Sequence, residues 1–149
     1  MHWKKEVYNF CCEILVERIN EAQRAIDAAQ DDSNSETKSS AGDKYETGRA
    51  MAQLEKERHA RRQAALEDML TNLRQIGCSP SKEWVTAGAL VQTTRGVYFV
   101  SVGLGTITID SQTYHCLSQQ SPFGQALLDL EVGDELDFRG ISHEILHIL

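Results

Sequence analysis

Gly42-Asp43-Lys44-Tyr45-Glu46-Thr47 is an acidic turn that separates two long segments with a heptad pattern. In the segment before this turn, apolar residues step by four and three over about six helical turns, as they do along the seam of a coiled coil. The residues of this seam are Tyr8, Cys12, Leu15, Ile19, Ala22, Ile26 and Ala29. The segment ends at residues 31–35, Asp-Asp-Ser-Asn-Ser, because these side chains favour turns and caps over helix interiors.

A second seam follows the turn and is apolar only toward its end. Counted back from Ile76 it contains Leu73, Met69 and Leu66, and then Arg62, His59, Glu55 and Ala52. This gradient predicts an intramolecular antiparallel hairpin whose base packs against a body and whose distal half is a solvated stalk. Each arm of about 28 residues would be roughly 40 Å long. A helix pair lying flat on a core would instead need an apolar stripe along its full length.

After Gly77 the apolar period changes from that of a helix to that of a strand. Three strand pairs are predicted, over residues 89–93 with 97–102, 106–109 with 113–117, and 135–138 with 141–149. A short helix over residues 123–128 follows Ser121-Pro122, since proline is tolerated in a first helical turn. The predicted fold class is α+β. An antiparallel coiled-coil hairpin over residues 1–77 precedes a small β-rich domain over residues 78–149.

Charge and composition restrict the class of partner. The net charge is −7, and residues 78–149 carry 3 Lys/Arg against 8 Asp/Glu. No basic patch is able to hold duplex DNA, so we expect a protein partner, or nucleic acid already held by a protein. No stretch approaches the roughly 20 apolar residues of a membrane span, and a signal peptide is not expected. Four cysteines without a CxxC pair favour a reduced cytoplasmic protein over a disulfide framework.

Asp43 and Glu46 are candidates for metal binding at the start of the second helix. Residues three apart share one face of a helix, so the two carboxylates would project together. Two converging carboxylates can hold a divalent ion when water or phosphate completes its shell. The alternative is capping, with Ser40 as N-cap and Asp43 at a capping-box spacing. Capping explains Glu46 less well, because Glu46 lies deeper in the helix.

Basic residues continue along the second arm. They are Lys44, Arg49, Lys56, Arg58, Arg61 and Arg62, and they alternate with Glu55 and Glu57. This mixture is typical of a solvated face with salt bridges, and the functional alternative is contact with RNA or phosphate near the turn.

Residues 143–147 match the HExxH pattern of zinc proteases, which requires a helix to bring both histidines to one face. Here the pattern alternates as in a strand, with Ile141, His143, Ile145, His147 and Leu149 predicted on one side. No downstream third ligand follows, so zinc catalysis is not expected.

Two stretches resemble the Gre family of bacterial transcript-cleavage and elongation factors. Ser121-Pro122-Phe123-Gly124-Gln125-Ala126-Leu127-Leu128, followed by Val132-Gly133-Asp134-Glu135, resembles the C-terminal signature of the family. Gly42-Asp43-x-x-Glu46 resembles the acidic motif at the tip of the family's hairpin. The resemblance covers nearly the whole chain. It implies an N-terminal coiled-coil hairpin and a C-terminal domain with an FK506-binding-protein-like fold.

The resemblance also implies a function. The hairpin would enter the secondary channel of RNA polymerase, where Asp43 and Glu46 would help to hold a second Mg²⁺ and its water. The 3′ segment of backtracked nascent RNA would then be hydrolysed, since two metals about 4 Å apart stabilise the attacking and leaving oxygens. Lys44, Arg49 and Arg58, together with Ser121, Pro122, Phe123 and Gly124, would contact polymerase or RNA. The factor would be a cytoplasmic monomer without an intrinsic metal or cofactor, and not an enzyme by itself.

Differences from the family pattern keep two other functions open. Thr47 stands where the family usually has Asn, Tyr45 replaces a smaller polar residue, and residues 48–51 depart from an Ala-rich continuation. One alternative is a regulator that occupies the secondary channel without stimulating cleavage. The other is a structural adaptor that uses its coiled coil to pair with another helix, for example in a dimer.

Overall fold

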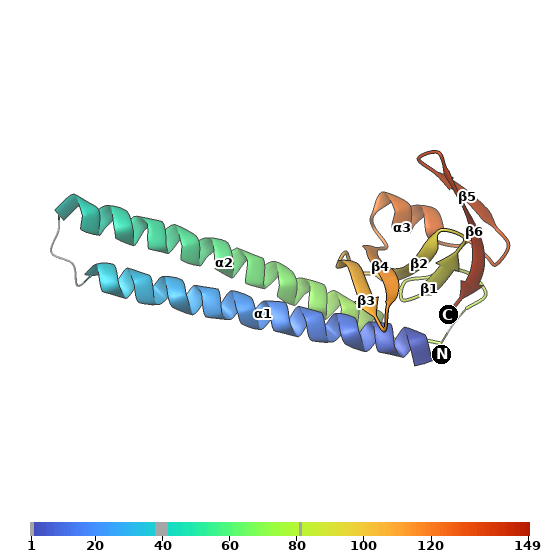
Figure 1. The fold of residues 1–149 in the computed structure, drawn as a ribbon, viewed down its shortest axis with the longest axis horizontal. Coiled ribbons are helices and arrows are strands. Elements are labelled where there is room, and N and C mark those ends of the chain that lie inside the picture. The colour runs from blue at the N-terminus through green and yellow to red at the C-terminus, as the bar shows by residue number, and fades with distance from the viewer. Residues whose placement is uncertain (1, 38–41, 81) are drawn as a thin grey trace. The chain divides into compact units, whose positions relative to one another are not determined.

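The computed structural model describes residues 2–37, 42–80 and 82–149, which form an α+β fold (Figure 1). Two long helices come first, and a six-stranded sheet with one short helix follows among the described residues. In chain order the elements are α1 (His2–Thr37), α2 (Gly42–Ile76), β1 (Leu90–Thr93), β2 (Gly96–Ser101), β3 (Gly105–Ile109), β4 (Gln112–Ser118), α3 (Pro122–Leu127), β5 (Glu135–Phe138) and β6 (Ile141–Ile148).

The chain divides into two compact units. The helical unit comprises residues 13–71, and the body unit comprises residues 1–12 and 72–149. The first part of α1, up to residue 12, and the last part of α2, from residue 72, therefore belong to the body unit. The sequence predicts two domains that meet after residue 77, and this division stays a prediction.

Within the helical unit, α1 and α2 run in opposite directions (Figure 1). Gln63 Nε2 donates a hydrogen bond to Gln23 Oε1 at 2.8 Å, and Lys56 Nζ donates one to Gln30 Oε1. From the first contact to the second, the position moves forward by seven residues in α1, from Gln23 to Gln30. It moves back by seven in α2, from Gln63 to Lys56, as expected for antiparallel helices. Small and branched apolar side chains are buried in this unit, and small ones allow close approach of the helix axes. They include Ala22, Ala29, Ala52, Leu66 and Leu70.

The first helix is longer than its sequence predicts. It continues through residues 31–35 and ends at Thr37. A hydrogen bond of 3.1 Å from Gln30 Nε2 to Asn34 Oδ1 joins neighbouring turns there, and such pairs four residues apart support a helix against unfavourable local propensity.

The sheet is mixed, with strand order β3-β4-β2-β1-β6-β5. Strands β2 and β4 pair in parallel, and the other neighbours are antiparallel. All three predicted strand pairs are present. The β3–β4 turn has Asp110 and Ser111 at positive φ, and the β5–β6 turn has Arg139 and Gly140 at positive φ. Two central residues at positive φ define the type I′ turn, which matches the twist of a hairpin.

One core cluster of the body unit lies between the sheet and the short helix. Its buried members are Val85, Ala89, Val91, Val100, Leu127 and Ile145. Helix α3 contacts β4 and β5 and contributes Leu127 to this core (Figure 1).

Across the described ranges, every helix is too short or too polar to cross a lipid bilayer.

Candidate functional site

The predicted acidic pair lies near the start of α2. The helix begins at Gly42, so Asp43 and Glu46 fall in its first two turns and are one helical turn apart. The side chain of Glu46 is exposed. The side chains of Asp43 and Lys44 and the whole of Ser40 lie outside the described residues, so the predicted convergence of carboxylates and the predicted cap stay predictions.

The basic residues of α2 are arranged as a solvated face where the structure describes them. Arg58 donates two hydrogen bonds to Glu55, at 2.7 and 2.8 Å, and His59 Nε2 lies 3.4 Å from the same carboxylate. The Arg58 side chain is 67% exposed, so this pair contributes little to stability. Arg49 is exposed one turn after Glu46. Glu46 and Arg49 thus present opposite charges to solvent on the first turns of α2.

In the body unit, the predicted contact stretch Ser121–Gly124 forms the start of α3. Ser121 is the N-cap, and its Oγ accepts a 3.0 Å hydrogen bond from Gly124 N while donating to Ser118 O at 2.6 Å. Pro122 occupies the first turn. Gly124 is buried so close to β4 that a Cβ atom on it would lie 2.1 Å from Ser118 O. Serine and glycine are therefore required here by the turn itself.

Phe123 belongs to an aromatic cluster that joins strands distant in sequence. Its ring lies 4.9 Å from Tyr98 on β2, 4.9 Å from Phe138 on β5 and 5.0 Å from His143 on β6. Tyr98 also stacks on His115 of β4 at 5.2 Å. The rings of Tyr98, Phe123 and Phe138 remain partly exposed, so the cluster presents an aromatic surface beside the start of α3.

His143 is the buried polar member of this cluster. Its side chain is 6% exposed, and its Nδ1 has no hydrogen-bond partner among the described residues. Burial lowers the pKa of His143 below its ordinary value, and the positive charge of Arg95 lowers it further. The neutral form of the imidazole is therefore favoured, and the ring packs against the aromatic side chains of the cluster.

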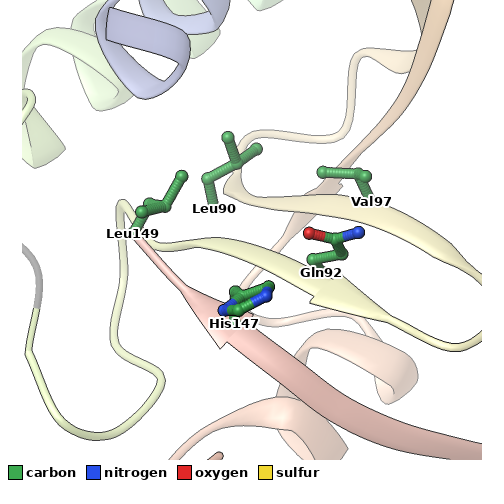
Figure 2. A pocket seen from close by; sticks show the side chains of 5 residues that line it. All are labelled: Leu90, Gln92, Val97, His147 and Leu149. Carbon is green, nitrogen blue, oxygen red and sulfur yellow. The ribbon is translucent and has the colours of Figure 1, made fainter. Parts of the chain in front are cut away.

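The HExxH residues lie on β6, as predicted, but the two histidines do not share a side of the strand. Gln92 pairs with His147 while Thr93 pairs with Ile145, so β6 carries one extra residue in a β-bulge. Ile145 joins the core with Val91, whereas His147 lines a hollow of about 10 Å³ with Leu90, Gln92, Val97 and Leu149 (Figure 2). Because side chains alternate along β1, Val91 and Gln92 point to opposite faces of the sheet, and so do Ile145 and His147 beside them.

The predicted one-sided row from Ile141 to Leu149 is consequently wrong after Ile145, because the bulge reverses the alternation. The hollow at His147 has room for about one water and is far smaller than a ligand pocket. Among the described residues, no three His, Cys, Asp or Glu side chains gather closely enough to hold a metal ion.

Sequence reasoning missed the partners of Phe123. Tyr98, His115 and His143 lie on three different strands, and no local pattern brings them together. The only sequence signal was the concentration of aromatic and histidine residues in predicted strands, which also describes an ordinary core.

No protein-family model and no curated protein sequence matches this chain. Its relation to the Gre family is therefore a proposal that rests on the residues of the two motifs.

Proposed function

We propose that this protein is a Gre-like transcription elongation factor that binds bacterial RNA polymerase through the secondary channel. In this proposal the helical unit is a coiled-coil hairpin, and the body unit has an FK506-binding-protein-like fold. The observation that carries it is Glu46, an exposed carboxylate one helical turn after Asp43 at the start of a long antiparallel helix. The side chain of Glu46 is exposed, so packing of the core does not select an acid at position 46.

The dimensions of the helical unit suit a narrow channel. Residues 13–37 of α1 would extend about 38 Å at the rise of an α-helix. Alanines at seam positions, such as Ala22, Ala29 and Ala52, keep the pair thin. Met51 and Leu54 expose more than half of their surface near the start of α2, and a partner that surrounds this part of the helix would cover them.

The body unit supplies the second contact in this proposal. Phe123 and its aromatic neighbours give an amphipathic surface of the kind that protein interfaces use, and Ser121 and Gly124 fix the backbone that presents it. With 8 Asp/Glu against 3 Lys/Arg, residues 78–149 favour a basic patch on the partner over nucleic acid.

The chemistry proposed for the acidic pair is electrostatic. Carboxylate oxygens are ligands that Mg²⁺ prefers, and an exposed Glu46 is able to share an ion whose other ligands come from polymerase and RNA. Such a metal would lower the pKa of its bound water and stabilise the charge on the scissile phosphate. Asp43 and Glu46 would position it and would neither give nor take a proton. The protein then acts only in complex, through the intrinsic cleavage activity of the polymerase.

A second function, occupation of the channel without cleavage, is favoured by Thr47 and Tyr45, which differ from the family pattern beside the acids. The adaptor function is weaker. The apolar seam of Ala22, Ala29 and Leu66 is already buried within one chain, and little of it is left for a second copy.

The test is transcript cleavage in a backtracked elongation complex with Mg²⁺, together with a direct binding assay on the polymerase. Wild type is compared with D43N/E46Q and with E67Q/D68N, a control that removes two exposed acids farther along α2. We expect cleavage to be stimulated by wild type and by the control but not by D43N/E46Q, with binding kept in all three.

Binding without stimulation by the wild type would identify the non-cleaving regulator. Absence of binding would refute the proposal, and concentration-dependent self-association would then favour the adaptor.

A further inference from the structure

Two cysteines from distant parts of the sequence touch inside the body unit. Cys11 Sγ on α1 lies 3.6 Å from Cys116 Sγ on β4, and the side chains are 0% and 3% exposed. Both are free thiols. A disulfide bond is about 2.05 Å long, so the sulfurs would have to close by roughly 1.6 Å. A rotation of at least one of the two side chains would have to close this gap.

The other two cysteines provide an internal comparison. Cys78 is exposed and Cys12 is half-buried, with its thiol hydrogen-bonded to Tyr8. Reactivity governed by exposure alone would therefore oxidise Cys78 first. Reactivity governed by the geometry of the fold would instead give one intramolecular product at Cys11 and Cys116.

We infer that Cys11 and Cys116 form a reversible disulfide when the folded protein meets a small peroxide. One thiolate attacks an oxygen of hydrogen peroxide, the O–O bond breaks, and a sulfenic acid and hydroxide are formed. The second thiol attacks the sulfenic sulfur, and water leaves. Two thiols lose two electrons and two protons, and one peroxide becomes two waters. This site is independent of the proposed function at α2.

Burial makes the reaction slow and selective for a small oxidant. The hydrogen bond to Cys116 raises the pKa of Cys11, and burial raises it further, so few Cys11 thiolates exist at neutral pH. Oxidation of the reduced pair therefore accelerates as pH rises, because the thiolate is the nucleophile. Bulky disulfide oxidants cannot reach sulfurs that are almost fully buried.

The bond would constrain the unfolded chain strongly. It would join residues 105 positions apart, and long closed loops lose the most entropy when they are cross-linked. The oxidised body unit should therefore unfold at a higher urea midpoint than the reduced one, and a thiol reductant should reverse the change.

The experiment uses the full chain with Cys12→Ser/Cys78→Ser, which leaves only the buried pair. The folded protein is treated with hydrogen peroxide, and intact mass and a non-reducing peptide map are recorded. We expect the loss of two hydrogens, one cross-linked peptide pair containing Cys11 and Cys116, a raised urea midpoint, and reversal by dithiothreitol. Adding Cys116→Ala to the same variant should abolish the cross-link and the shift in midpoint.

Four results would overturn the inference. The buried thiols could stay reduced even after prolonged exposure to hydrogen peroxide at raised pH. They could gain oxygen atoms without cross-linking. The cross-link could form only in denaturant, or could lower the midpoint, and either outcome would mean that the native contact does not favour the bond.

Discussion

Gly124→Ala is a substitution for which local propensity and packing predict opposite signs. Alanine in place of glycine normally stabilises a helix by at most about 1 kcal/mol. At this position, however, the added Cβ would stand 2.1 Å from Ser118 O and 2.9 Å from Ser121 Oγ, whereas ordinary contacts begin near 3.4 Å. The nearest atom is a backbone carbonyl at the end of β4, so the conflict cannot be relieved by rotating a side chain.

The loss of stability can be estimated from the shift between the start of α3 and Ser118 that the added Cβ would require. Opening the contact by about 1 Å breaks the hydrogen bond of Gly124 N to Ser121 Oγ, a capping interaction that contributes about 1 kcal/mol. That loss cancels the gain in helix propensity. The remaining overpacking, with a typical cost of 1–3 kcal/mol, leaves Gly124→Ala about 2 kcal/mol less stable. In a unit of this size the melting temperature would fall by roughly 10 °C.

The assay is urea unfolding followed by tryptophan fluorescence, because Trp84 lies in the body unit. The matched control is Gly103→Ala, where a Cβ meets nothing within 4 Å. The control should remain within about 0.5 kcal/mol of wild type, or be slightly more stable, through reduced entropy of the unfolded chain. If Gly124→Ala unfolds at the wild-type midpoint or above it, the close approach of α3 to β4 is not what selects glycine.

Three further predictions concern the body unit. Ser121→Ala should destabilise it by about 1 kcal/mol through loss of the cap, and Ser121→Thr should recover most of this in the same urea assay. Ile145→Ala should cost about 3 kcal/mol because the side chain is 1% exposed, whereas Ile141→Ala, at a residue 50% exposed, should change the midpoint little. His143 has a pKa below 6.5 in the fold, so the unfolded chain binds a proton first, and stability should fall as pH drops below about 6.5. Urea midpoints between pH 7.5 and 5.5 should show this slope in wild type and a shallower slope in His143→Gln; equal slopes would contradict the assignment.

Local patterns predicted the elements of this fold but not all of their partners. The strand pairs follow from short turns, because residues such as Arg139-Gly140 adopt the type I′ conformation that closes a hairpin. The parallel pairing of β2 with β4 does not follow from any turn, since β3 lies between them in sequence. It depends on side chains that meet only after folding. For the same reason the stacking of Tyr98 on His115 could not be read from the sequence.

Two local predictions failed. In one, contacts along the helix overrode the turn preference of single residues, and in the other, a bulge interrupted the alternation of a strand. The end of α1 passes through residues 31–35, where turn-forming residues are held in the helix by contacts such as Gln30 with Asn34. The alternation of β6 reverses after Ile145 because one residue bulges out of the ladder. A bulge has no reliable sequence signature in a strand of apolar and histidine residues, and it changes which side chains share a face.

The two motifs that resemble the Gre family differ in how strongly they support a shared function. Ser121 caps α3 and Gly124 permits close packing, so the fold alone is enough to explain both residues. Their match to the signature therefore argues for a shared turn and not for a shared partner. Glu46 is different, because its side chain is exposed and capping explains it less well than it explains Asp43. An exposed acid that the core does not select is informative about function. The D43N/E46Q comparison thus tests the function at the acidic pair, where capping is a competing explanation for Asp43 but a weaker one for Glu46.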